Sequence, residues 1–129
     1  MKSKLPKEFV WTIERTKTGY SAFENDFPLY TTSRTTSKLL NQCYEAETLY
    51  FNETNEAIQE VRHRFVWNWQ SFFTHYKILN ARLFADRIGM NASLLSQYIK
   101  GTKVPSPQQE QKIIRGIQMI GRELSRIEL

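Results

Sequence analysis

Cysteine is almost absent from this 129-residue chain, which has only Cys43. An internal disulfide is therefore impossible, and a metal site built on thiolates is nearly excluded. No apolar run approaches the roughly 20 residues that a membrane-spanning helix needs. The start, "MKSKLPKEF", is basic but lacks the apolar stretch of a secretory signal peptide. These absences predict a soluble protein of the cytoplasm.

Acidic residues are scarce in the second half of the chain. Residues 61–129 contain 11 Lys/Arg and 4 Asp/Glu, whereas residues 1–60 contain 7 Lys/Arg and 9 Asp/Glu. A basic surplus confined to one half is typical of a surface that binds an anion such as nucleic acid. The simpler alternative is that both halves carry ordinary solvated charges.

The residue groupings that catalysis requires are also missing. Four carboxylates of the first half, Glu8, Glu14, Glu24 and Asp26, scatter over expected strands and a turn, so they do not predict a two-metal nuclease site. His63 and His75 lack a third partner for a metal and are expected at the edge of the core or at the surface. The sequence has no P-loop and no glycine-rich nucleotide turn. We therefore expect no enzymatic activity, no metal and no cofactor.

The second half is punctuated by residues that begin and end helices. Asparagine is a favoured N-cap, and glycine ends helices in the left-handed conformation. Two prolines in "TKVPSP" exclude a regular helix there. The predicted helices begin after Asn68 (to about Lys77), after Asn80 (ending at Gly89), after Asn91 (ending at Gly101) and at Pro107.

Two short capped helices joined by a glycine turn predict a helix-turn-helix. The first of them has its apolar face at Ala81, Phe84, Ala85 and Ile88, and the second has Leu95, Tyr98 and Ile99 facing inward. The second would be the recognition helix, with short polar residues at its start. Gln97 can reach a base edge, and adenine is its best bidentate match. The predicted DNA-binding residues are Asn91, Ala92, Ser93, Ser96, Gln97, Lys100, Thr102 and Lys103.

Residues 81–107, "ARLFADRIGMNASLLSQYIKGTKVPSP", resemble the helix-turn-helix of the lambda repressor/Cro-type family. The shared pattern is apolar-Ala-x-x-apolar-Gly, a polar cap, Ser-x-Leu-Ser, Tyr-apolar-x-Gly and a basic loop with Pro-Ser. The resemblance covers about residues 67–120. It implies a bundle of about five helices that binds duplex DNA, usually as a dimer on a two-fold site, with Gln97 as a base-contacting residue.

The first half has the pattern of a small sheet with a helix. Phe9, Trp11 and Ile13 alternate with polar or outward residues, which predicts a strand, and "YSAF" and "PLYTT" predict two more. A helix is expected from a cap at Thr35 or Ser37 to about Phe51. Its expected inner stripe is Leu39, Cys43, Ala46 and Tyr50, and "RHRFVWNW" can return as a fourth strand.

Residues 7–66 resemble, more weakly, HicB-type antitoxins, which are shortened ribonuclease H-like units. In that family a strand pair is followed by a Thr-x-Gly-x-Thr segment and a helix. Here "TTSRTT", residues 31–36, takes that place with Ser33 instead of glycine. The resemblance implies a toxin as protein partner, and the expected partner-binding residues are Thr31, Thr32, Ser33, Arg34, Thr35 and Lys38.

The long last helix suggests self-association. Its apolar residues Ile113, Ile117, Ile120, Leu124 and Ile127 recur every three or four positions, further than a small bundle needs. Gly116 and Gly121 would let another backbone come close, so a homodimer is expected. Alternatively, this helix packs back on the first domain.

These observations predict an α+β chain with two domains. Residues 1–66 would form a three- to four-stranded antiparallel sheet with one helix, and residues 67–129 an all-α helix-turn-helix bundle. The expected function is that of a DNA-binding, nucleoid-associated regulator, such as an antitoxin that represses its own operon. The alternative is a protein- or RNA-interaction module without specific DNA binding.

Overall fold

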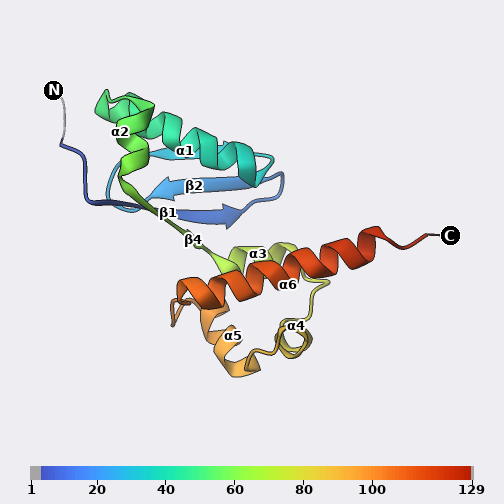
Figure 1. The fold of residues 1–129 in the computed structure, drawn as a ribbon. Coiled ribbons are helices and arrows are strands. Elements are labelled where there is room, and N and C mark those ends of the chain that lie inside the picture. Colours follow the sequence, from blue (N-terminus) through green and yellow to red (C-terminus); the bar gives the residue numbers. More distant parts are fainter. Residues whose placement is uncertain (1–3, 129) are drawn as a thin grey trace. The chain divides into compact units, whose positions relative to one another are not determined.

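The computed structural model describes residues 4–128. They form an α+β structure with a four-stranded mixed sheet and six helices (Figure 1). Contacts divide the chain into two compact units, of which one ends at His75 and the other begins at Tyr76. We predicted two domains with a boundary after residue 66. A division by contacts does not test which parts of the chain fold independently, so that boundary stays a prediction.

The sheet is built from β1 (Glu8–Arg15), β2 (Tyr20–Glu24), β3 (Tyr30–Ser33) and β4 (Arg62–Trp67), in the order β3-β2-β1-β4. β1 pairs antiparallel with β2, placing Ile13 opposite Ala22, and β2 pairs antiparallel with β3. β4 runs parallel to β1. The expectation of a purely antiparallel sheet was therefore wrong. Two helices lie between β3 and β4 in the chain, and a helical crossover of this kind allows β4 to run parallel to its neighbour β1.

The core of the first unit follows from the period of two in β1. Phe9, Trp11 and Ile13 are buried, as the alternation predicted. Ring contacts extend this core, with Phe9 packing edge-on against Phe51 at 5.6 Å between centroids. The same buried cluster includes Ala22 on β2 and Leu39 on the following helix.

Two helices, not the single one expected, lie between β3 and β4. α1 (Thr36–Phe51) begins after Thr35, one of the two predicted caps, whose hydroxyl accepts from Lys38 N, and it ends at Asn52 in the left-handed conformation. The short α2 (Asn55–Glu60) was missed, although Thr54 is its N-cap and Ile58 anchors it in the core.

The inner face of α1 also differs from the prediction. Its buried residues are Leu39, Cys43, Glu47 and Phe51, spaced every four positions. Tyr50 is exposed and Ala46 is only half-buried. The prediction assigned inner positions by hydrophobicity alone, so it did not include the buried Glu47.

α3 (Trp69–His75) belongs to the first unit. The side chain of Asn68 accepts from Ser71 N at 3.1 Å, as expected of the residue before the helix. Ser71 Oγ in turn accepts from Arg15 N at the end of β1, at 3.0 Å. Trp69, Phe72 and Phe73 are buried, but the helix ends two residues before the expected Lys77.

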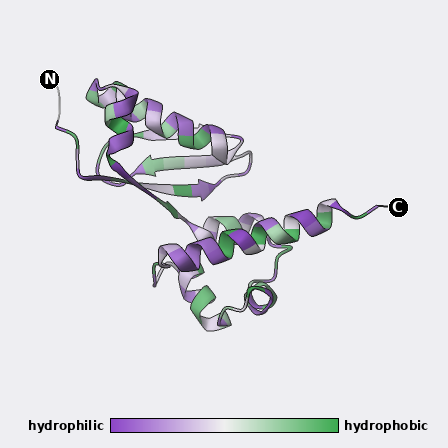
Figure 2. Ribbon diagram, viewed as in Figure 1, coloured by the Kyte–Doolittle hydropathy of each residue, from purple (hydrophilic) through white to green (hydrophobic). Residues whose placement is uncertain are grey.

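The second unit contains α4 (Ala81–Ile88), α5 (Ala92–Lys100) and α6 (Pro107–Ser125). Its buried residues include Phe84, Ala85, Leu95, Tyr98 and Ile113. Figure 2 shows hydrophilic and hydrophobic residues alternating along α6. No helix among the described residues is long and apolar enough to cross a membrane.

Candidate nucleic-acid interface

α4 and α5 are joined by a short turn whose geometry is set by the predicted capping residues. Asn80 begins α4, and Gly89 ends it with φ 69°. Asn91 begins α5, and Gly101 ends it with φ 80°. Both glycines adopt the left-handed conformation that other residues rarely take. The turn therefore fixes the direction of α5 relative to α4.

α5 presents a polar face opposite its buried one. Leu95 and Tyr98 are buried, and Ile99 is half-buried, as predicted. Ser93, Gln97 and Lys100 are exposed, and their spacing of four and three residues places them on the same side of a helix. Ala92 and Ser96 are half-buried beside them. The structure thus brings the predicted residues of this helix together on one surface.

Three of the predicted DNA-binding residues flank the helix and serve partly as caps. Asn91 Oδ1 accepts from Ser93 N at 2.9 Å and from Leu94 N at 3.1 Å, which leaves its amide N–H groups for a ligand. Thr102 donates its hydroxyl to the Gln97 carbonyl at 3.3 Å. Lys103 is exposed just beyond it. Lys103 is therefore free to contact phosphate, whereas Thr102 is mainly a helix-terminating residue.

The electrostatics of this surface favour an anion. The chain has no Asp or Glu between Asp86 and Glu110, a stretch that contains all of α5 and the loop after it. From Tyr76 onward, the sequence contains nine Lys/Arg and four Asp/Glu. One of these acids, Glu123, is paired with Arg87. A polyanion that approached α5 would meet no carboxylate on that helix.

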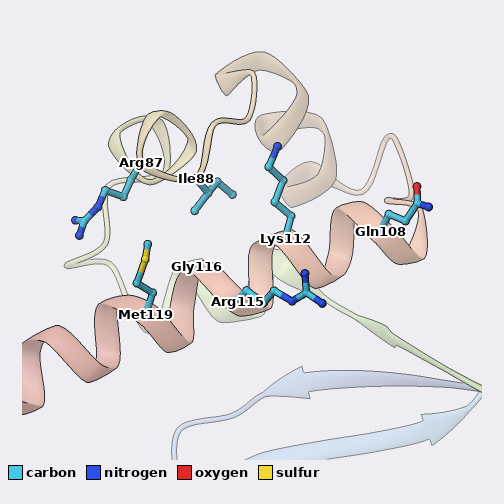
Figure 3. Close-up of a pocket in the computed structure, with 7 residues that line it drawn as sticks. All are labelled: Arg87, Ile88, Gln108, Lys112, Arg115, Gly116 and Met119. Atoms are coloured by element: carbon cyan, nitrogen blue, oxygen red, sulfur yellow. The ribbon is translucent and has the colours of Figure 1, made fainter.

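A groove of about 500 Å³ lies between α4 and α6 in the same unit (Figure 3). Its apolar part comes from Ile88, Gly116 and Met119, and Arg87, Lys112 and Arg115 line it with positive charge. Lys112 Nζ donates to the Gly89 carbonyl at 3.1 Å, which ties α6 to the end of α4. A Cβ added at Gly116 would overlap Ile88 Cγ2 and lie 3.1 Å from Phe84 Cζ.

This contact corrects the expectation about Gly116. The glycine was expected to admit another protomer's backbone, but α4 of the same chain already occupies that space. At Gly121, by contrast, no other described residue lies within 4 Å of such a Cβ. The apolar stripe beyond it is exposed, with Leu124 60 % and Ile127 71 % accessible, and the helix ends at Ser125.

The predicted partner-binding residues lie at one edge of the sheet and in its connection to α1. Thr31, Thr32 and Ser33 belong to the edge strand β3. The Thr31 hydroxyl donates to Gln42 Oε1 at 3.4 Å, whereas Thr35 caps α1. Arg34 and Lys38 are exposed. The set is contiguous, and Thr31 and Thr35 are engaged within the unit.

The structure also contains a buried polar network that the sequence did not reveal. Glu47 is fully buried, and its carboxyl group lies 2.7 Å from Trp11 Nε1 and 2.7 Å from His63 Nε2. His63 Nδ1 contacts the Val61 carbonyl at 2.8 Å. Glu47 follows Leu39 and Cys43 at a spacing of four residues, and this was the one signal in the sequence that it lies on the buried face of α1.

Glu24 is also buried, and its carboxylate accepts from Val10 N at 2.8 Å and from Phe27 N at 2.9 Å. Both carboxylates therefore organise the fold.

Cys43 is expected to be chemically inert while the chain is folded. Burial raises the pKa of the Cys43 thiol to about 12, and the nearby Glu47 adds to this shift. Because only the thiolate reacts, alkylation should stay slow from pH 7 to 9 and become fast in denaturant. Since the folded pKa is the higher one, the unfolded chain loses this proton first, and stability should fall as pH rises from about 9 towards 12. Rapid labelling of the native protein at pH 8 would contradict the assignment of Cys43 to the core.

Among residues 4–128, no group of three or more His, Cys, Asp or Glu side chains is placed to hold a metal ion. The candidate site among these residues is the exposed face of α5 with the caps Asn91 and Gly101. Comparison of the chain with protein-family models, with curated proteins and with solved structures gives no match.

Proposed function

We propose that the second unit binds duplex DNA sequence-specifically, with α4 and α5 acting as a helix-turn-helix and α5 as the recognition helix. The observation that carries the proposal is the exposed face of α5. It combines short polar side chains, Gln97 and Lys100 between two well-formed caps, without a carboxylate. The resemblance of residues 81–107 to the lambda repressor/Cro-type family supports the same function.

The exposed residues of α5 and of the loop after it differ in the hydrogen bonds they can make, which suggests different roles in DNA binding. Side chains that read bases must present both donors and acceptors to the major groove, and Gln97 is the exposed residue of α5 that has both together with sufficient reach. Lys100 and Lys103 provide only charge and donors, which suits phosphate contacts. We therefore assign sequence reading to Gln97, with Ser93 beside it, and positioning to the lysines.

Replacing Gln97 with alanine should weaken binding to the selected site by about 1–3 kcal/mol and leave binding to random duplex almost unchanged. The preferred site is first obtained by selection from a random duplex library with the full chain. Affinities for that site and for scrambled DNA are then measured by fluorescence anisotropy. An unchanged ratio between the two would show that Gln97 does not read a base.

Lys103→Ala is the matched test of the phosphate contacts. It should weaken binding to the selected and the scrambled duplex alike, and lower the slope of log affinity against log salt by about one. Affinity that hardly changes with salt would remove the DNA proposal and favour a protein-interaction module.

We further propose that the first unit binds a protein partner, a toxin, as its resemblance to HicB-type antitoxins implies. The open edge of β3 supports this, because an edge strand can pair with a strand of another protein. The test is co-purification of the full chain with the product of the neighbouring reading frame. A chain that binds its operator but captures no such protein would be a regulator without a toxin.

A further inference from the structure

A second hollow lies in the first unit, where the turn between β1 and β2 meets the end of β3. Its volume is about 310 Å³, and five of its seven lining residues carry a hydroxyl group. The lining residues are Thr16, Thr18, Gly19, Tyr20, Thr32, Ser33 and Arg34. We call it the β3-end hollow. All of its lining residues belong to the first unit.

The turn that forms one wall is held rigidly. Arg15 Nη1 donates to the carbonyls of Thr16 and Gly19, both at 2.6 Å, and its guanidinium lies 4.7 Å from the centroid of the Tyr20 ring. Thr16 Oγ1 accepts from Gly19 N at 3.1 Å, so its own hydrogen is left to donate. The hollow is therefore a preformed feature of the turn.

Gly19 lets the turn approach the other wall closely. A Cβ at this position would overlap the Ser33 carbonyl oxygen and lie 2.9 Å from Arg34 Cα. Both of these atoms belong to the backbone, which cannot swing aside as a flexible side chain can. The absence of a side chain at Gly19 thus lets the turn lie directly against the backbone of Ser33 and Arg34.

The charge around the hollow is opposite to that of the rest of this half of the chain. Residues 1–60 have an acidic surplus, yet residues 15–20 and 31–38 contain no Asp or Glu. They contain Arg15, Lys17, Arg34 and Lys38. Arg34 is exposed, and its guanidinium has no ion-pair partner within residues 4–128. An anion that approached this surface would therefore meet positive charge and no carboxylate from these two segments.

We propose that the β3-end hollow binds a phosphate group. Hydroxyl groups donate single hydrogen bonds to phosphate oxygens, and a guanidinium can donate two in parallel. Arg34 supplies the charge, and Thr16 and Ser33, which also line the hollow, carry hydroxyls that can act as neutral donors. The lining contains no carboxylate that would repel the anion. The phosphate can be a monoester on a small molecule or a phosphodiester of a nucleic-acid strand.

The experiment is a titration of the full, isotope-labelled chain, followed by the backbone amide signals of residues 16–20 and 32–34. The probes are inorganic phosphate, adenosine monophosphate and a short oligothymidylate. Arg34→Gln should weaken binding of the probes at these amides by at least about tenfold, as expected for loss of a charged hydrogen-bonding partner. Arg64→Gln is the matched control, because Arg64 is also exposed but lies on β4, at the opposite edge of the sheet.

Each outcome decides one point. Shifts with phosphate and the monophosphate but not the oligonucleotide identify a monoester site, and stronger binding of the oligonucleotide identifies a strand-binding site. Absence of shifts at these amides, or equal weakening by both variants, overturns the proposal. The proposal does not depend on α5, since failure of Gln97→Ala to change DNA specificity would leave these amide shifts unaffected.

Discussion

Replacing Glu47 with alanine should destabilise the first unit by about 3–5 kcal/mol, the usual cost of breaking a buried charged or strongly hydrogen-bonded pair. The carboxyl group bonds two side chains that are distant in the sequence, Trp11 and His63. Alanine would leave the indole N–H and one imidazole nitrogen buried without partners. Because Glu47 is fully buried, alanine would also leave a cavity next to Trp11 and His63.

Glutamine at position 47 should preserve most of this stability. His63 Nδ1 contacts a carbonyl, which can only accept, so that nitrogen carries a proton. One further proton then lies between His63 Nε2 and the carboxyl oxygen of Glu47. The amide of glutamine can donate to a neutral His63 and accept from Trp11, so both hydrogen bonds are retained. Glu47→Gln should therefore lie much closer to the wild type than Glu47→Ala.

Denaturant unfolding followed by tryptophan fluorescence can measure these differences, because all three tryptophans, Trp11, Trp67 and Trp69, lie in the first unit. Glu45→Ala is the matched control, since Glu45 is exposed on the same helix. It should change stability by less than about 0.5 kcal/mol. Equal effects of the alanine variants at positions 45 and 47 would show that the network contributes no special stability.

The contrast between Glu47 and the helix caps explains what the sequence could predict. Asn80 and Asn91 were assigned correctly, and Thr35 was one of two candidates, because a cap is decided by residues two or three positions away. The left-handed ends at Gly89 and Gly101 are equally local. The period of two in β1 also contained enough information to identify Phe9, Trp11 and Ile13 as core.

Features that depend on distant partners were missed. Glu47 is buried because Trp11 and His63, 36 and 16 residues away, bond its carboxyl group. β4 pairs parallel with β1, and this pairing depends on the position at which α2 ends. α2 has only six residues, and it was not predicted. The β3-end hollow arises from two separate segments that meet at Gly19. For the candidate interface, local signals placed α5 and its exposed residues, but which of them touch a ligand stays a prediction.

Gly116→Leu should destabilise the second unit by about 3 kcal/mol, at the upper end of the usual cost of overpacking. Even a Cβ at this position would overlap Ile88, so a leucine must push α6 away from α4. The groove lined by Arg87, Lys112 and Met119 would then be rebuilt. Because α4 orients α5, affinity for the selected DNA site should fall as well. Far-ultraviolet circular dichroism suits this measurement, since the second unit has no tryptophan.

Gly121→Leu is the control in the same helix, and it also tests self-association. None of residues 4–128 lies within 4 Å of a Cβ at Gly121, so leucine should gain up to about 1 kcal/mol of helix propensity over glycine. Gly121→Leu should therefore keep or raise the stability of the monomer.

If another copy packs against the exposed stripe of Leu124 and Ile127, however, the leucine would obstruct it. Analytical ultracentrifugation should then show a weakened dimer in Gly121→Leu with an intact fold. A wild type that is monomeric and binds a single DNA half-site would refute the homodimer. Equal destabilisation by leucine at positions 116 and 121 would contradict the contact between Gly116 and Ile88.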